Sequence, residues 1–409
     1  MAEQHGKTLV PQIRFAGFTD PWEQRKLGEL FEESDERASD REILSVSVAN
    51  GIYPASESDR ETNPGASLAN YKVVHSGDVV YNSMRMWQGA VDASRYDGIV
   101  SPAYVVAKPN SEVYARFFAR LLRQPMLLKQ YQQVSQGNSK DTQVLKFDDF
   151  ASIEISMPAS ENEQRQIGAF FDRLDSLITL HQRKYDKLCV LKKSMLDKMF
   201  PKGGSLYPEI RFAGFTDPWE QRKLSDLTDR VSIQSSDSDL PQVEYEDIIP
   251  GEGTLNKDLR DKKGGKTGIK FYAGDVLYGK LRPYLMNWLY PQFNGVAVGD
   301  FWVLRATECD SSFLYRLVQT GSFQRLANVS SGSKMPRADW NLISQSFFAV
   351  PADHAEQKAI AKGLAELDTL ITLHQRKYCG VASWMLGVAL VRLGSESDGA
   401  FGEMKHVLR

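Results

Sequence analysis

The chain contains two copies of the same sequence frame. Arg14–Leu27 reads RFAGFTDPWEQRKL, and Arg211–Leu224 reads the same fourteen letters. Leu177–Tyr185 reads LITLHQRKY, and Leu370–Tyr378 repeats it. The first pair of blocks is 197 residues apart and the second pair 193, so the two halves are nearly equal in length. Such a repeat predicts a duplicated module and an internal pseudo-two-fold relation between the copies.

Between the repeated blocks, the two halves are related but different. Gly77–Arg85 (GDVVYNSMR) aligns with Gly274–Arg282 (GDVLYGKLR) at the same offset of 197 residues. Gly137–Lys140 (GNSK) lies opposite Ser331–Lys334 (SGSK). A constant frame with different inserts indicates two copies of one module, each of which recognises something different.

Each module has the sequence pattern of a mixed α and β domain. Short runs rich in β-branched residues, bounded by Gly, Pro, Ser and Asp, predict strands at Lys72–Tyr81, Ile99–Val106 and Ile153–Met157. Apolar residues at helical spacing predict helices at Glu112–Gln124 and Ser311–Gln319.

A long helix is predicted to follow each module. Apolar residues recur at alternate steps of four and three from Ile167 onward, interrupted at Lys192. This heptad pattern predicts a helix over about Glu163–Phe200, about 55 Å long. His181 and His374 occupy the same heptad position, where a half-buried polar residue fixes the register of a helix pair. We expect the two helices to form an antiparallel coiled coil whose seam residues are Ile167, Phe171, Leu174, Ile178, Tyr185, Ile360, Leu364, Leu367, Ile371 and Tyr378.

The composition is that of a folded chain with little net charge. Of the 409 residues 42% are hydrophobic, and 50 basic residues face 52 acidic ones. Any nucleic-acid contact therefore has to come from local clusters of charge. The three cysteines are scattered and form no CxxC, which argues against a disulfide scaffold or a metal site. The first ten residues lack a signal-peptide core and no run of eighteen apolar residues occurs, so we expect a cytoplasmic location.

Two motifs with known chemistry are incomplete. Gly274–Leu281 nearly fits the phosphate-binding pattern GxxxxGK[ST], but Leu281 has no hydroxyl for Mg²⁺. The two TDPW segments that end at Trp22 and Trp219 faintly resemble a methyltransferase motif that has two prolines, and each contains one. We favour a turn that opens each module, with both tryptophans packed inward. No Ser/His/Asp set or carboxylate pair stands out, so no catalytic residue is predicted.

Basic and aromatic residues gather in loops at matching places in both halves. Lys257–Lys270 contains six basic residues and two acidic ones, with glycines that let the backbone approach a phosphate. Arg and Lys suit guanine edges and phosphates, and Asn and Gln suit adenine. One such cluster is more often a solvated surface, but recurrence in both halves favours DNA binding. The candidate DNA-binding residues are Tyr81, Asn82, Arg85, Gln136, Asn138, Lys140, Lys262, Lys263, Lys266, Tyr278, Lys280, Arg282, Tyr284, Lys334 and Arg337.

The two double repeats, together with the phrases GDVLYGKLRPYL and SGSKMPR, resemble the specificity subunit of type I restriction–modification systems over about residues 11–378. The resemblance implies two target-recognition domains that each read one half of a split sequence in double-stranded DNA. It implies that long helices separate these domains and dock two modification subunits, and that restriction/translocase subunits join the complex. It also implies a non-catalytic chain without a cofactor or a membrane partner, with S-adenosylmethionine, ATP and Mg²⁺ on the partner subunits.

The predicted fold class is α+β, with two mixed α/β target-recognition domains separated by two long antiparallel helices. The first target-recognition domain is expected at residues 1–160 and the central helical repeat at 161–202. The second recognition domain is expected at 203–352, the C-terminal helical repeat at 353–390 and an atypical Gly-rich tail at 391–409.

The C-terminal helical repeat departs from the first copy after Tyr378. The apolar seam continues at Val381, Met385 and Val388, but two glycines follow Tyr378 within this stretch. Each glycine costs about 1 kcal/mol in a helix interior. The basic residues of the first copy also give way to a nearly all-apolar stretch. We therefore expect weakened solubility or weakened partner docking at this end.

A tandem scaffold that binds two protein copies and touches DNA incidentally is the alternative function. Exchanging residues 28–150 for another insert separates the two, because recognition predicts a changed methylated half-site and scaffolding predicts none. A stand-alone methyltransferase or nuclease predicts cofactor binding by the chain alone, and the missing motifs argue against it.

Overall fold

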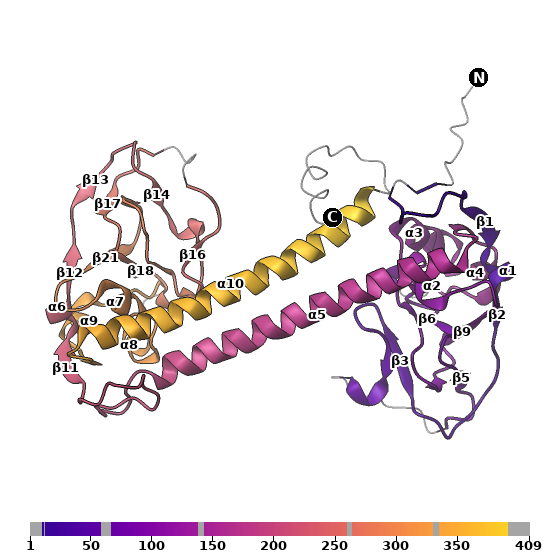
Figure 1. Cartoon of the computed structure of the whole chain (residues 1–409), viewed down its shortest axis with the longest axis horizontal. Helices are drawn as coiled ribbons and strands as arrows, with labels where there is room; N and C mark the ends of the chain where they lie inside the picture. Colours follow the sequence, from indigo (N-terminus) through magenta and orange to yellow (C-terminus); the bar gives the residue numbers. More distant parts are fainter. Residues whose placement is uncertain are drawn as a thin grey trace. The chain divides into compact units, whose positions relative to one another are not determined.

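The structure is a computed structural model of a chain that divides into two compact units. One unit comprises Met1–Leu180 with Cys379–Arg409, and the other comprises His181–Tyr378. We call them unit 1 and unit 2. Both combine small sheets with helices (Figure 1). The structure describes residues 10–11, 13–58, 67–137, 143–259, 264–329 and 335–391, and of the last of these only the backbone from Tyr378 onward.

Unit 1 is built on an antiparallel four-stranded sheet with the order β2-β9-β6-β7. Val79 of β6 lies opposite Ala107 of β9 and Ala93 of β7, and all three are fully buried. Three strand pairs, β1-β10, β3-β4 and β5-β8, complete the unit. The elements are β1 Glu23–Lys26, α1 Leu27–Leu30, β2 Phe31–Glu33, β3 Leu44–Ser47, β4 Gly51–Pro54, β5 Lys72–Val74, β6 Val79–Asn82, β7 Val91–Ala93, β8 Gly98–Val100, β9 Tyr104–Pro109, α2 Ala115–Leu121, α3 Pro125–Val134, α4 Phe147–Ala151, β10 Glu154–Met157 and α5 Glu161–Lys198, whose residues from His181 onward belong to unit 2.

Unit 2 has a four-stranded sheet with the corresponding order β12-β21-β18-β19. A second sheet, β13-β17-β20-β14, contains a parallel pair, β14 with β20. The strand pairs β11-β22 and β15-β16 complete the unit. The elements are β11 Glu220–Lys223, α6 Leu224–Leu227, β12 Thr228–Val231, β13 Gln234–Ser235, β14 Gln242–Val243, β15 Ile248–Ile249, β16 Thr254–Leu255, β17 Gly268–Phe271, β18 Val276–Gly279, β19 Trp288–Leu289, β20 Gly295–Ala297, β21 Phe301–Ala306, α7 Ser311–Leu317, α8 Gly321–Ala327, α9 Trp340–Gln345, β22 Phe347–Val350 and α10 His354–Val391, whose residues after Tyr378 belong to unit 1.

Two of the predicted strands are each divided in two, and one predicted helix is shorter than expected. The run Lys72–Tyr81 forms β5 and β6, because the chain turns at Gly77, whose φ of 102° suits glycine. The run Ile99–Val106 forms β8 and β9, with Pro102 in the connection, where it donates no ladder hydrogen bond. The predicted helix Glu112–Gln124 is the shorter α2, and α3 begins at Pro125, which suits the first helical position.

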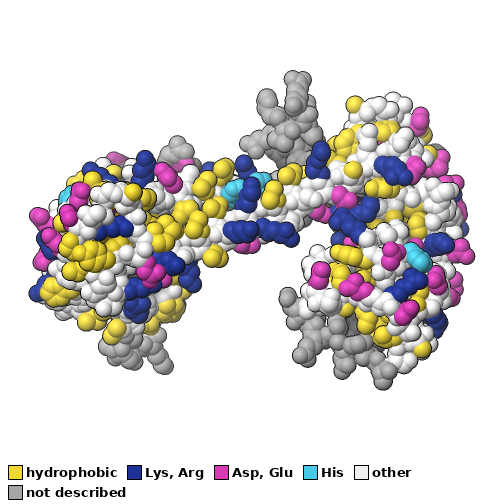
Figure 2. Space-filling model, turned by 60° about the horizontal axis from the view of Figure 1, so that its bottom comes forward, with side chains coloured by type: hydrophobic (Ala, Val, Ile, Leu, Met, Phe, Trp, Pro, Cys, Tyr) yellow, Lys and Arg dark blue, Asp and Glu magenta, His cyan; other side chains and the backbone are white. Residues whose placement is uncertain are grey.

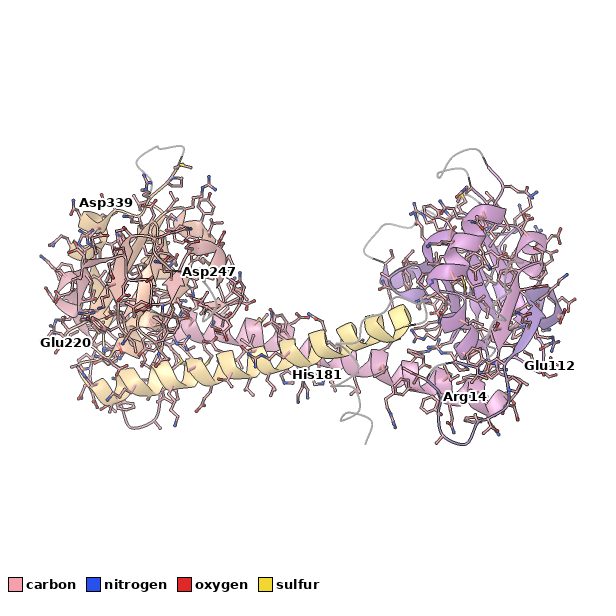
Figure 3. All side chains as sticks on the ribbon, turned by 90° about the horizontal axis from the view of Figure 1, so that it is seen from above. Arg14, Glu112, His181, Glu220, Asp247 and Asp339 are labelled. Atoms are coloured by element: carbon pink, nitrogen blue, oxygen red, sulfur yellow. The ribbon has the colours of Figure 1, made fainter. Side chains whose placement is uncertain are left out.

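The repeated block RFAGFTDPWEQRKL is fixed to the start of a long helix in each unit. In unit 1, Arg14 donates two hydrogen bonds of 2.7 Å to the carboxylate of Glu163, and the indole of Trp22 donates to the same carboxylate at 3.3 Å. Figure 3 shows Arg14 beside the beginning of α5. Glu163 and Trp22 are buried, so the carboxylate satisfies a buried indole and holds the N-terminal segment in place.

The same arrangement occurs in unit 2. Arg211 donates to Glu356 at 2.6 and 2.8 Å, and the indole of Trp219 donates to Glu356 at 3.2 Å. The prediction that both tryptophans pack inward is confirmed, since both are buried. The identity of the repeated letters therefore has a structural cause, because the same side chains close the same contact in each unit.

The two long helices, α5 and α10, have 38 residues each. Glu161 and Glu163 lie in the first turn of α5, where they oppose the partial positive charge of the helix N-terminus. The backbone of α10 remains helical to Val391, although the sequence departs from the first copy after Tyr378. Among the residues the structure describes, no helix is long and apolar enough to cross a bilayer.

Within unit 2, the second half of α5 packs antiparallel against the first part of α10. His181 contacts His374 and Lys192 pairs with Asp368, so residue numbers rise on one helix as they fall on the other. The end of α5 enters the hydrophobic core, where Phe200 lies 5.9 Å from Trp219 and 5.5 Å from Phe313 between ring centroids. The charge of Lys192, which interrupts the apolar seam, is thus neutralised at 2.6 Å by a carboxylate of the facing helix.

Candidate nucleic-acid interface

In unit 1, two loops from distant parts of the sequence lie side by side. The hairpin loop (residues 83–90) connects β6 and β7, and the long loop (residues 136–144) follows α3. The backbones of Gln136 and Val144 pair at the base of the long loop. Leu145 then donates its amide to the carbonyl of Ser83 at 2.9 Å. The hairpin loop and the described ends of the long loop therefore meet in space.

In unit 2, the corresponding loops meet in the same way. The hairpin loop (residues 280–287) connects β18 and β19, and the long loop (residues 328–339) follows α8. Ala338 donates its amide to the carbonyl of Lys280 at 2.8 Å, and Arg282 donates to the carbonyl of Pro336 at 2.8 Å. Figure 3 shows Asp339, at the end of the long loop, on the side of unit 2 away from α10. We define the hairpin loop and long loop of each unit as its candidate interface.

A carboxylate organises the cations of the unit 2 interface. Arg337 donates to the carboxylate of Asp300 at 3.0 Å, and the ammonium of Lys280 lies 3.5 Å from the other oxygen. Tyr245 supports the same place, because its hydroxyl donates to the backbone oxygen of Asp300 and accepts from the amide of Leu281 at 3.2 Å. Burial raises the pKa of the Tyr245 hydroxyl to about 12, so it stays protonated at neutral pH. Two cations share one carboxylate, which leaves the cluster net positive.

The basic segment 257–270 is tethered to acidic residues of unit 2. The ammonium of Lys266 lies 2.6 Å from Glu244, and this hydrogen bond raises the pKa of Lys266. Lys257 lies 2.8 Å from a carboxylate oxygen of Asp247, a fully buried residue. Part of the positive charge that the sequence predicted for DNA is therefore compensated within the unit. Lys262 and Lys263 lie outside the described residues, as do Asn138, Lys140 and Lys334.

Among its described residues, the unit 1 interface carries fewer charged side chains than the unit 2 interface. The side-chain oxygen of Asn82 accepts from the amide of Met84 at 3.0 Å, and Gln136 donates to Asp149 at 3.1 Å. Arg85 is exposed and donates to Gln88 at 3.4 Å, and it forms no ion pair with a described residue. These side chains lie at the surface of the two loops, and Arg85 supplies the exposed positive charge among the described residues there.

The prediction that Tyr81 and Tyr278 contact DNA is wrong, because both rings belong to the hydrophobic cores. Tyr81 packs 5.1 Å from Phe150 between ring centroids, and Tyr278 stacks 5.8 Å from Trp302. Burial raises the pKa of both hydroxyls. Side chains alternate across a strand, so a period-two reading of Val79–Tyr81 places the tyrosine on the core face with Val79. Arg282 and Tyr284, on the loop after β18, are exposed.

The predicted seam residues lie on the less exposed faces of α5 and α10. Ile360 and Leu364 are buried, and Tyr378 lies outside the residues whose side chains are described. Ile167 packs against the core of unit 1, and Leu367 against that of unit 2. The half-buried members are Ile167, Phe171, Leu174, Ile178, Tyr185, Leu367 and Ile371.

The repeated block LITLHQRKY has a second apolar feature that was not predicted from the sequence. Leu177 and Leu180 of α5 are 39% and 46% exposed, and the matching Leu370 and Leu373 of α10 are 43% and 44% exposed. Figure 2 shows hydrophobic and basic side chains next to one another along the long helices. The signal was available in the sequence, because both pairs have a spacing of three residues and lie outside the seam. Each unit therefore presents the same small apolar patch on its helix.

The histidine pair is a second polar contact between the long helices, beside the ion pair of Lys192 with Asp368. The Nδ1 atoms of His181 and His374 lie 2.9 Å apart, so one ring donates and the other accepts. Burial, with positive charge from His181, Lys184 and Lys377, lowers the pKa of His374. The described residues contain no cluster of three or more His, Cys, Asp or Glu side chains that could hold a metal ion.

Comparison with known proteins finds similar sequences and similar structures. The model of the type I restriction modification DNA specificity domain matches residues 19–189. The specificity subunit of type I restriction enzyme MjaVIII from Methanocaldococcus jannaschii is 23% identical over 251 residues, which cover 56% of this chain and 58% of that relative. The EcoDI specificity subunit from Escherichia coli is 24% identical over 161 residues, 37% of this chain and 36% of that relative. The chain thus spans less than two thirds of the length of either relative.

A solved structure has the same fold over nearly the whole chain. The S subunit of a type I restriction–modification system from M. genitalium superposes with a TM-score of 0.54 at 12% identity. The match covers 93% of this chain and 98% of that chain. These matches make the chain similar to type I restriction–modification specificity subunits, in sequence over residues 19–189 and in fold over nearly the whole chain.

Proposed function

We propose that this chain reads a bipartite target in double-stranded DNA and gives sequence specificity to a type I complex that methylates adenine. One observation carries the proposal: the hairpin loop and long loop meet in both units, through Leu145 and Ser83 in one and Ala338 and Lys280 in the other. The side chains on these loops differ between the units. Base-edge contacts must differ if two different sequences are read.

The charge of the two interfaces supports contact with a duplex. Unit 2 presents Lys280, Arg282 and Arg337 around the carboxylate of Asp300, and unit 1 presents Arg85 without a carboxylate partner among the described residues. Arginine is the residue that most often reads guanine in the major groove, and lysine and arginine neutralise phosphates. The net charge of −2 for the whole chain is compatible with this, because the cations are local.

The two identical leucine pairs support docking of two modification subunits. Leu177 with Leu180 and Leu370 with Leu373 present the same apolar patch twice, and identical patches suit two copies of one partner around a pseudo-two-fold axis. The antiparallel packing of His181 with His374 at the centre of the repeated block supports a coiled coil between the recognition domains. We place S-adenosylmethionine, ATP and Mg²⁺ on the modification and restriction subunits, and give this chain no catalytic role.

Exchange of the insert at residues 28–150 for that of another specificity subunit tests the proposal. The expected result is a new methylated sequence in one half of the target, with the other half unchanged. The measurement is sequencing of methylated adenines in cells that contain the modification subunit and either chain. The proposal fails if the exchanged chain assembles with its partner and the methylated sequence stays the same.

That failing outcome is also the one expected of a tandem protein scaffold, the alternative favoured by the exposed leucine pairs. A scaffold would assemble two partners through Leu177, Leu180 and their counterparts, and the loops would not influence the DNA sequence. The matched control is the double variant Leu177→Ser/Leu180→Ser, which is expected to release one modification subunit in analytical ultracentrifugation. The leucines act in both hypotheses, so only the loop exchange separates them.

A further inference from the structure

The hairpin loop of unit 2 exposes three consecutive large apolar side chains. Tyr284, Leu285 and Met286 are 54%, 39% and 42% exposed. We call these three residues the apolar tip. Three adjacent exposed residues of this kind are an unfavourable surface in water, and such a feature marks a place where a partner binds.

The backbone holds the apolar tip in a fixed outward position. Arg282 and Met286, on either side of a single helical turn, have φ values of 50° and 57°, and they are the only non-glycine residues with positive φ in the part of the chain that the structure describes. Left-handed conformations in such residues are strained and persist where the surroundings impose them. Pro283, between them, is buried and anchors the turn.

Hydrogen bonds from three directions impose this conformation. The amide of Arg282 donates to Pro336 at 2.8 Å, and the amide of Gly251 donates to the carbonyl of Met286 at 2.9 Å. At the base of the loop, Gly279 donates to Asn287 at 2.7 Å. The apolar tip is therefore a preformed projection of unit 2, and its exposure is not the result of a loosely held loop.

The hairpin loop of unit 1 shows that the shared strand pair does not require the bulky residues of its loop to be exposed. There Met86 is fully buried and Trp87 packs against the core, with its indole donating to the carbonyl of Met84 at 3.1 Å. The same connection between two paired strands can thus keep two of its three bulky apolar residues against the core, while Met84 is 44% exposed. In unit 2 the three residues of the apolar tip are exposed instead, and the hydrogen bonds of the loop hold them in that position.

The charges beside the apolar tip fit a duplex. Arg282 is exposed and forms no ion pair with a described residue, while Lys280 and Arg337 share the carboxylate of Asp300. Three cations against one carboxylate suit the phosphates that flank a base step. Apolar side chains that enter between base pairs unstack the step and bend the duplex, and flanking cations hold the backbones on both sides.

We propose that the apolar tip of unit 2 inserts at a base step of its half-site and bends the duplex, so that this half-site is read partly through its deformability. The inference rests on the proposed function and adds to it an asymmetry, because the hairpin loop of unit 1 exposes one bulky apolar side chain, Met84, where that of unit 2 exposes three in a row. Steps that unstack at little cost, such as pyrimidine–purine steps, are then favoured at that position without any base-edge hydrogen bond.

The test uses the complete complex of this chain with its modification subunit, on a duplex that contains both half-sites. Fluorescent dyes at the duplex ends report bending through energy transfer. 2-Aminopurine at successive positions of each half-site, other than the adenine that is methylated, reports unstacking. The variant is Tyr284→Ser/Leu285→Ser/Met286→Ser. The control is Phe347→Ser, since Phe347 is an equally exposed ring on β22 of the same unit.

The native complex is expected to shorten the distance between the duplex ends and to raise 2-aminopurine fluorescence at one step of one half-site. The triple variant is expected to lose both signals and to bind at least tenfold more weakly, while the control keeps them. A duplex with a mismatch at that step is already unstacked, and it should restore binding by the triple variant to within about threefold of the native complex.

Two results would overturn the inference. In one, the native complex leaves the duplex straight, or the triple variant bends it equally, while the preference for the target sequence over a scrambled duplex is intact. In the other, the triple variant loses the modification subunit in ultracentrifugation, which would assign the tip to a protein interface. A native complex without any sequence preference would contradict the proposed function itself, which separates the two failures.

Discussion

The two units share a frame and differ where the frame ends in loops. Tyr81 and Tyr278 occupy the same frame position, and both are buried in a core behind a four-stranded sheet. A few residues later the chains diverge, since Trp87 of unit 1 packs against the core and the aligned Tyr284 of unit 2 is exposed. The comparison indicates that the frame is maintained for folding and that the loops are free to differ. Substitutions at equivalent positions of the repeated sequence should therefore have similar effects in the two units, whereas a substitution in a loop should affect one unit only.

The largest paired effect is expected for Tyr81→Ala and Tyr278→Ala. Each removes a fully buried ring, and truncation of a buried aromatic side chain costs about 3–5 kcal/mol of the free energy of unfolding. Urea denaturation followed by tryptophan fluorescence measures it. The control is Tyr284→Ala, an exposed tyrosine whose removal should change the free energy of unfolding by less than about 0.5 kcal/mol. A large loss in one unit and none in the other would break the comparison.

The next largest effect is expected from substitution of a loop arginine, which should weaken discrimination between base pairs in one half-site only. Arg337→Ala removes a guanidinium of the unit 2 interface, and loss of a base contact costs about 1–3 kcal/mol of discrimination at one base pair. Arg85→Ala should do the same in the other half-site. Methylation of duplexes with single base changes, in competition, measures both. Equal loss over every sequence would instead identify the arginine as a phosphate contact.

Much of the frame was predictable from the sequence. The heptad pattern predicted a helix over about residues 163–200, and α5 spans Glu161–Lys198. The inward packing of Trp22 and Trp219 followed from the repeated block. The partners of these tryptophans did not, because Glu163 and Glu356 are 141 and 137 residues away and read as ordinary charges at the start of a helix.

The candidate interface was predictable only in part. The alignment of the halves indicated which loops correspond, and these loops meet within each unit. It did not indicate which aromatic residues face outward, because a pattern of rings beside cations ignores the alternation along β6 and β18 that buries Tyr81 and Tyr278. The left-handed conformations at Arg282 and Met286 have no sequence signal either, since they depend on contacts with Pro336 and Gly251.

A smaller effect, and a shared one, is expected at the histidine pair. The pKa of His374 is lowered in the folded chain, so the unfolded chain binds more protons as the pH falls below about 6.5. The contribution of the pair to stability is therefore complete above that pH and is lost as the pH decreases. Thermal unfolding between pH 7.5 and 5.5 measures the decrease, and His374→Gln should flatten it. An unchanged slope in that variant would assign the pH dependence to other groups.

The smallest effect on the free energy of unfolding is expected at the hydroxyl groups of Tyr81 and Tyr278, which occupy equivalent positions in the two units. The hydroxyl of Tyr278 donates to Gln324 at 3.3 Å, whereas the buried hydroxyl of Tyr81 has no hydrogen-bond partner among the described residues. Tyr278→Phe should cost about 1 kcal/mol, the usual net contribution of a hydrogen bond. Tyr81→Phe should be neutral or slightly stabilising, because it removes an unsatisfied buried polar group. Urea denaturation of the two variants in parallel measures the difference, and a cost for Tyr81→Phe equal to that for Tyr278→Phe would show that the hydroxyl in unit 1 has a partner after all.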